Sequence, residues 1–147
     1  MTSINNMAGL DARTASYALL LLRLALGAMW VSHALLKILV FTLPGAAGFF
    51  ESVGLPGFLV YPVVAAEIGG GIAVATGFYG RYASLLLLPI LLVAAWVHFP
   101  NGWVFTATGG GWEYPVFLAV ASVVHVLAGD GAWSMKLPRL HLATCAI

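Results

Sequence analysis

Three ionisable side chains, Arg23, His33 and Lys37, lie within one long apolar run of the sequence, residues 16–41. On an α-helix, at about 100° per residue, these positions fall within an arc of roughly 80°, and Trp30 lies beside them. Side chains of these types can donate hydrogen bonds to a small bound ligand and exchange protons with it. One face of the predicted helix therefore carries groups that could do chemistry.

A charge in this position needs a partner, because a charged side chain at the centre of a lipid-embedded helix costs roughly 2.5 to 3.5 kcal/mol. Glu67, in the next apolar run, is the first candidate. His33 and Glu67 each lie about eight residues from the outer end of their run, roughly 12 Å deep, so they could touch. Arg23 lies roughly one turn deeper and could either reach Glu67 or extend toward the inner surface.

Two compatible interpretations follow for these residues. In the structural one, Arg23 and Glu67 form a buried charge pair that fixes the register of two helices. In the functional one, Glu67, His33 and Lys37 are catalytic groups that line a polar pocket in the outer half of the bilayer. Trp30 is predicted to take part in ligand binding there.

Four further residues lie at the predicted outer ends of the later helices and are candidates for ligand binding: His98, Asn101, Glu113 and Tyr114. Each is also of a type that is common where a helix meets interfacial water. His125 lies near the opposite end, and we expect it to be either a hydrogen-bonded core residue or one that faces a cavity.

The composition is that of an integral membrane protein. Of 147 residues, 62% are hydrophobic and 7% charged, and the mean hydropathy is +1.01. A net charge of +1 with no basic run argues against nucleic acid as a partner. The single cysteine, Cys145, excludes an intramolecular disulfide or a thiol redox pair. No histidines pair at one depth for haem, and no ligand spacing or motif predicts a metal or a flavin.

The apolar runs predict an all-α, polytopic membrane protein, because a chain in lipid must satisfy its own backbone hydrogen bonds. We expect one domain, residues 1–147, built as an antiparallel bundle of four transmembrane helices between tails 1–15 and 129–147. The basic residues near the helix ends place both termini in the cytoplasm. The predicted helices span residues 16–41, 59–78, 82–97 and 114–128.

The connections and small residues add detail. Residues 77–81 form so short a turn that the helices on either side must be antiparallel neighbours. The first loop, residues 42–58, suggests one or two amphipathic turns on the outer surface. The third, residues 100–112, is rich in aromatic residues and is either an interfacial belt or the lid of a site. Gly69, Ala73 and Gly77 form a stripe that predicts close helix packing.

Taken together, these residues resemble the DoxX family over residues 19–134. The resemblance implies a small bacterial protein of the inner membrane, with links to quinones and to membrane-associated oxidoreductase complexes. It is carried by an ordered set of motifs: Arg23-Leu24, Gly27, His33, Lys37, Gly54-Leu55-Pro56, Glu67, Gly70, Gly77, Arg81, His98, Pro100-Asn101-Gly102 and Glu113-Tyr114-Pro115.

Three functions are then open. The first is a quinone-interacting membrane oxidoreductase component, in which His33 or Lys37 binds a quinone carbonyl and Glu67 exchanges a proton, with electrons supplied by a partner subunit. The second is a non-catalytic subunit that anchors or assembles such a complex in the lipid bilayer. The third is a small proton-coupled transporter, since charges within the membrane also mark ion pathways.

Overall fold

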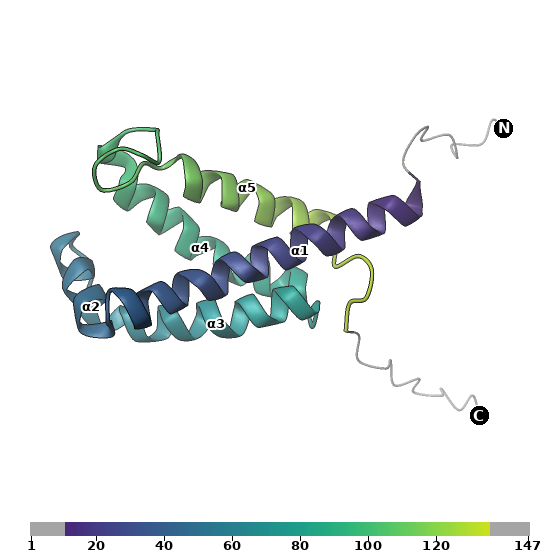
Figure 1. Ribbon diagram of the computed structural model, residues 1–147, viewed down its shortest axis with the longest axis horizontal. Coiled ribbons are helices and arrows are strands. Elements are labelled where there is room, and N and C mark those ends of the chain that lie inside the picture. Colours follow the sequence, from purple (N-terminus) through teal and green to yellow (C-terminus); the bar gives the residue numbers. More distant parts are fainter. Residues whose placement is uncertain (1–10, 136–147) are drawn as a thin grey trace, which may run out of the picture.

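The computed structural model describes residues 11–135, and that part of the chain is entirely helical outside its loops. Figure 1 shows four long helices, α1, α3, α4 and α5, with a short helix α2 at the far end of α1. This confirms the all-α bundle, with α2 as an additional element. The helices are α1 Ala12–Leu35, α2 Leu43–Ser52, α3 Val60–Thr76, α4 Gly80–His98 and α5 Glu113–Ala128.

Within residues 11–135, three segments are long and apolar enough to cross a membrane: Ala12–Val40, Gly57–Thr76 and Gly80–Asn101. The first combines α1 with a π-helical turn, Leu36–Val40, that continues it. The fourth predicted span, α5, is apolar but has only 16 residues, or about 24 Å at 1.5 Å per residue. The four predicted spans therefore exist as helices, and α5 is the shortest of them.

The turn between α3 and α4 makes those helices antiparallel neighbours, as its length predicts. Gly77 ends α3 in the left-handed conformation, with φ of 72°, which costs glycine little because it has no Cβ atom. The helices in Figure 1 form two pairs, α1 with α3 and α4 with α5. The pairs are close together near this turn and diverge toward α2 and the loop that follows α4.

Glycines allow α1 and α3 to approach closely. A Cβ atom on Gly27 would lie 2.6 Å from Ala75 Cβ and 2.7 Å from the carbonyl oxygen of Gly71. The predicted stripe is wrong for Gly69, since a Cβ atom there would have no neighbour within 4 Å. The close contact with α1 is made by Gly71 instead, because the face of α3 that contains Gly71 is the one turned toward α1.

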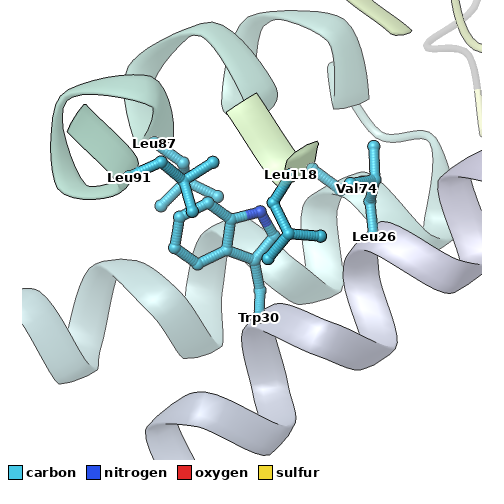
Figure 2. Close-up of a cluster of buried hydrophobic side chains, with 6 residues drawn as sticks. All are labelled: Leu26, Trp30, Val74, Leu87, Leu91 and Leu118. Atoms are coloured by element: carbon cyan, nitrogen blue, oxygen red, sulfur yellow. The ribbon is translucent and has the colours of Figure 1, made fainter. Parts of the chain in front are cut away.

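The hydrophobic core lies between the two helix pairs. Figure 2 shows Trp30 of α1 pointing into a group of aliphatic side chains that come from all four long helices. The core therefore joins the two pairs at one level of the bundle. Its buried members are Leu26, Trp30, Val74, Leu87, Leu91 and Leu118.

The contact between Gly27 and Gly71 gives a test of the packing. We expect Gly27→Ala to lower the free energy of unfolding by about 1–3 kcal/mol, because its methyl group would overlap backbone atoms of α3. Gly69→Ala is the matched control and should raise stability by about 0.5–1 kcal/mol through helix propensity. Thermal unfolding of both variants in detergent measures the difference, and equal midpoints would contradict this packing.

Candidate functional site

The charged centre of the bundle is an ion pair between Lys37 and Glu67. Lys37 Nζ lies 2.8 Å from Glu67 Oε1 and 2.9 Å from Oε2, so the ammonium group donates to both carboxylate oxygens. The side chains are 18% and 3% exposed, respectively. Such a pair can persist inside an apolar bundle because each charge is neutralised by the other.

Arg23 does not pair with Glu67, which corrects the structural charge pair expected from the sequence. Arg23 Nη2 donates instead to the carbonyl oxygen of Ala132, at 2.9 Å. The Arg23 guanidinium packs against Gly77, at the end of α3, which is ten residues or about 15 Å along the helix from Glu67. The sequence estimate placed Arg23 only one turn below Glu67, and Lys37 is the residue at the level of the carboxylate.

A cavity of about 390 Å³ lies beside the ion pair, between the two helix pairs. Most of its lining is aliphatic or aromatic, with a few polar groups, which is the usual make-up of a small-molecule site. The structure brings together six of the predicted site residues around it: Trp30, His33, Lys37, Glu67, His98 and Tyr114.

His33 and Tyr114 close the side of the cavity between α1 and α5. Their ring centroids are 5.7 Å apart, with the planes inclined by 32°. The Tyr114 hydroxyl group also donates to the sulfur of Met29, at 3.3 Å. Both aromatic rings therefore have fixed positions on the cavity wall.

His98 is oriented by the loop that follows α4. Its Nδ1 lies 3.0 Å from the carbonyl oxygen of Gly109. Because a carbonyl oxygen can only accept, Nδ1 carries the hydrogen atom, and Nε2 is an acceptor whenever the imidazole is neutral. His98 therefore offers a hydrogen-bond acceptor at the cavity wall.

Asn101 and Glu113 do not line this cavity, so their predicted place in it is wrong. Asn101 Nδ2 donates to the carbonyl oxygens of Gly109 and Gly110, at 3.0 and 2.8 Å, and so holds the loop that orients His98. Glu113 begins α5 and borders a separate shallow hollow with Trp103. Helix spacing alone does not reveal this, because the position of Asn101 depends on its hydrogen bonds within the loop.

The cavity is covered at its outer end by α2 and the segment after it, and not by the third loop. Phe49, Phe50, Val53 and Leu55 line it, whereas residues 99–113 contribute nothing. Within the third loop, Trp103 and Trp112 stack edge to face with centroids 4.4 Å apart. Trp96 and Phe99 are exposed beside it. The described residues therefore give the lid interpretation no support, and the aromatic interfacial belt stays a prediction.

A second polar cluster, which the sequence analysis missed in part, lies near the opposite end of the bundle. His125 is fully buried; its Nδ1 lies 2.8 Å from Ser84 Oγ and its Nε2 3.2 Å from Asp130 Oδ1. The carboxylate favours the hydrogen atom on Nε2, so Nδ1 accepts from the Ser84 hydroxyl group. His125 is thus a hydrogen-bonded core residue. Ser84 looked like an ordinary helix residue, and Asp130 lay outside every predicted helix.

Metal binding finds no support within residues 11–135. No three His, Cys, Asp or Glu side chains there are grouped so that they could hold a metal ion. Cys145 lies outside the described residues.

The fold and the cavity define a polytopic membrane protein with an ion pair on the wall of an internal, mainly apolar cavity. The chain belongs to the DoxX family, whose profile matches residues 18–100. That range covers α1 from residue 18 onward and all of α2, α3 and α4, and therefore includes the ion pair, His33 and His98.

Two bacterial relatives are similar to parts of the chain. "Putative oxidoreductase CatD" of Bacillus subtilis (strain 168) is 36% identical over 75 residues, which are 51% of this chain and 54% of that protein. "Inner membrane protein YqjF" of Escherichia coli (strain K12) is 33% identical over 57 residues, 39% of this chain and 44% of that protein. The chain thus matches about half the length of these curated relatives. No solved structure matches.

The ion pair can be tested with a double-mutant cycle. We expect Lys37→Met to cost about 3–5 kcal/mol of stability, because it leaves the Glu67 carboxylate buried without a partner. The double variant Lys37→Met, Glu67→Gln should be more stable than Lys37→Met alone, since it removes the uncompensated charge. The free energy of unfolding in detergent is measured for the wild type, the two single variants and the double variant.

The control for this cycle is Glu51→Gln, which neutralises an exposed carboxylate on α2 and should leave stability unchanged within about 0.5 kcal/mol. Strictly additive effects of the Lys37 and Glu67 substitutions would contradict the direct ion pair.

Proposed function

We propose that this protein is a membrane oxidoreductase component that binds a quinone in the cavity beside Lys37 and Glu67. The observation that carries the proposal is the ion pair itself, which stands on the wall of a mainly apolar cavity within the lipid-spanning part of the chain. A quinone headgroup is a flat, mainly apolar ring with carbonyl oxygens at its edge, and it needs both kinds of contact.

The cavity offers hydrogen-bond partners for both redox forms of such a ligand. A quinone carbonyl oxygen accepts, and Lys37 can donate to it, because its third contact, with the carbonyl oxygen of His33, is long at 3.4 Å. The imidazole N–H of His33 is a second donor on the same wall. A quinol hydroxyl group donates, and Nε2 of His98 can accept from it.

Proton balance gives Glu67 its role. Reduction of a quinone to a quinol takes up two electrons and two protons, one proton on each oxygen. We assign both electrons to a redox partner subunit. The Glu67 carboxylate, which lines the cavity, would take up each of the two protons from water in turn and pass it to the ligand, and it would be a carboxylate again after each transfer. Lys37 would then stabilise the Glu67 carboxylate once its proton has left.

The name of one relative supports the redox class. CatD of Bacillus subtilis, 36% identical over 75 residues, is described as a putative oxidoreductase. The match to the DoxX family covers residues 18–100, and this segment includes Lys37 and Glu67. This favours an oxidoreductase component over a proton-coupled transporter.

We place the protein in the bacterial inner membrane with both ends in the cytoplasm. YqjF, the relative from Escherichia coli, is named an inner membrane protein. The first residues of α1 and α4 lie at the same end of the bundle in Figure 1, and that end carries the exposed Arg13 and Arg81. An excess of basic residues is typical of the cytoplasmic side.

Binding of a quinone analogue is the direct test. In detergent, we expect a short-tailed ubiquinone analogue to quench the fluorescence of Trp30 as it binds to the wild-type protein. His33→Ala should weaken binding about tenfold, the effect of one lost hydrogen bond of roughly 1.4 kcal/mol. Glu67→Gln should slow quinone reduction by the assembled complex more than it weakens binding, because it removes the exchangeable proton.

Glu113→Gln serves as the matched control, since Glu113 lies at the same end of the bundle but outside the cavity. Unchanged binding in both His33→Ala and Glu67→Gln would reject the site. A partner enzyme that keeps its full turnover with His33 and Glu67 neutralised would instead identify the chain as an anchoring subunit.

A further inference from the structure

Three of the four sides of the cavity are closed by contacts between helices. Between α1 and α3, the glycine contact and the ion pair join the two helices below and beside the cavity. Between α1 and α5, the stacked rings of His33 and Tyr114 form the wall. On the third side, α4 and α5 pack directly against one another. The remaining side is the one between α3 and α4.

On that fourth side, α3 and α4 touch below the cavity and separate beside it. Their close contact is at Gly70, where a Cβ atom would lie 2.7 Å from Leu87 Cδ1. Further out, Val63 of α3 and Pro89 and Val93 of α4 all line the cavity, and the two helices diverge in Figure 1. Beyond Gly70 and Leu87, the facing residues of α3 and α4 therefore line the cavity and no longer pack against each other.

The border of this side is apolar and faces lipid. Pro89 is exposed, and Val93 is 42% exposed although it also lines the cavity. Both helices belong to segments that are long and apolar enough to cross the membrane. The cavity therefore meets the hydrocarbon interior of the bilayer at this side, where acyl or isoprenoid chains are soluble.

We propose that the gap between α3 and α4, bordered by Val63, Pro89 and Val93, is a lateral opening that passes the isoprenoid tail of the bound quinone into the lipid. This inference rests on the proposed function. It also follows from size: a cavity of about 390 Å³ is near the lower end of the range for small-molecule sites, roughly 300–1,000 Å³. A cavity of this size holds the headgroup with at most the first part of its tail, so the rest of a long isoprenoid tail must leave it.

Narrowing the opening should distinguish tailed from tail-less ligands. We expect Val63→Trp and Val93→Trp, reconstituted in lipid nanodiscs, to bind a decyl-substituted benzoquinone at least about tenfold more weakly than the wild type. The same headgroup without a tail should lose at least several-fold less affinity in each variant than the tailed quinone does, because Val63 and Val93 border the cavity and the tail adds a second contact with them. Leu86→Trp is the control, because Leu86 is 77% exposed on α4 and does not line the cavity.

The outcomes separate this inference from the proposed function. If the wild type binds neither quinone, both fail. If the wild type binds both quinones and the tryptophan variants keep full affinity for the tailed one, the lateral opening is wrong and the quinone site stands.

If a tryptophan variant binds neither the tailed nor the tail-less quinone, a second measurement on the wild-type protein tests the opening. A quinone with a photoreactive group at the end of its tail is cross-linked to the wild-type protein, and the modified peptides are identified by mass spectrometry. We expect labels on residues 59–67 and 89–97. Labels confined to α2 or to the lipid-facing side of α5 would overturn the proposal.

Discussion

The ion pair between Lys37 and Glu67 is the constraint on which the rest of the site depends. Both residues lie on apolar helices, and neither charge is stable there alone. Lys37 Nζ reaches both carboxylate oxygens, at 2.8 and 2.9 Å, and it joins the same two helices that approach closely at Gly27 and Gly71. The π-helical turn at Leu36–Val40 contains Lys37, and such turns are frequent at functional sites.

An apolar layer separates the two polar regions of the bundle. Trp30, Leu91 and Leu118 belong to the core of Figure 2 and also form part of the cavity wall. Beyond this layer, His125 joins Ser84 to Asp130, and Arg23 holds the carbonyl group of Ala132. These lower contacts fix the segment after α5 against the other helices. The apolar layer that forms one wall of the cavity is therefore supported by these polar contacts on its other side.

The sequence predicts the helices and the central chemistry well, because a charge in an apolar run is rare and must be accounted for. This reasoning placed Lys37, His33 and Glu67 at one pocket. It chose Arg23 as the partner of Glu67 because depth was counted from estimated helix ends, while α1 begins at Ala12 and Lys37 lies level with the carboxylate. Asn101 and the Ser84 contact depend on loop geometry and helix rotation, which residue spacing does not determine.

The short helix α2 closes one end of the cavity. Its phenylalanines, Phe49 and Phe50, cover the outer end of the cavity. Thr42 caps the helix with φ of 61°, an uncommon conformation for a β-branched residue. The helix is held against α1 and α3 by Ala46, which is buried in a cluster with Ala34, Val60 and Val64. With apolar side chains over this end and the lateral opening proposed between α3 and α4, a ligand would enter the cavity from lipid rather than from water. An ion pair in such a place selects ligands that are apolar over most of their surface and polar at one end.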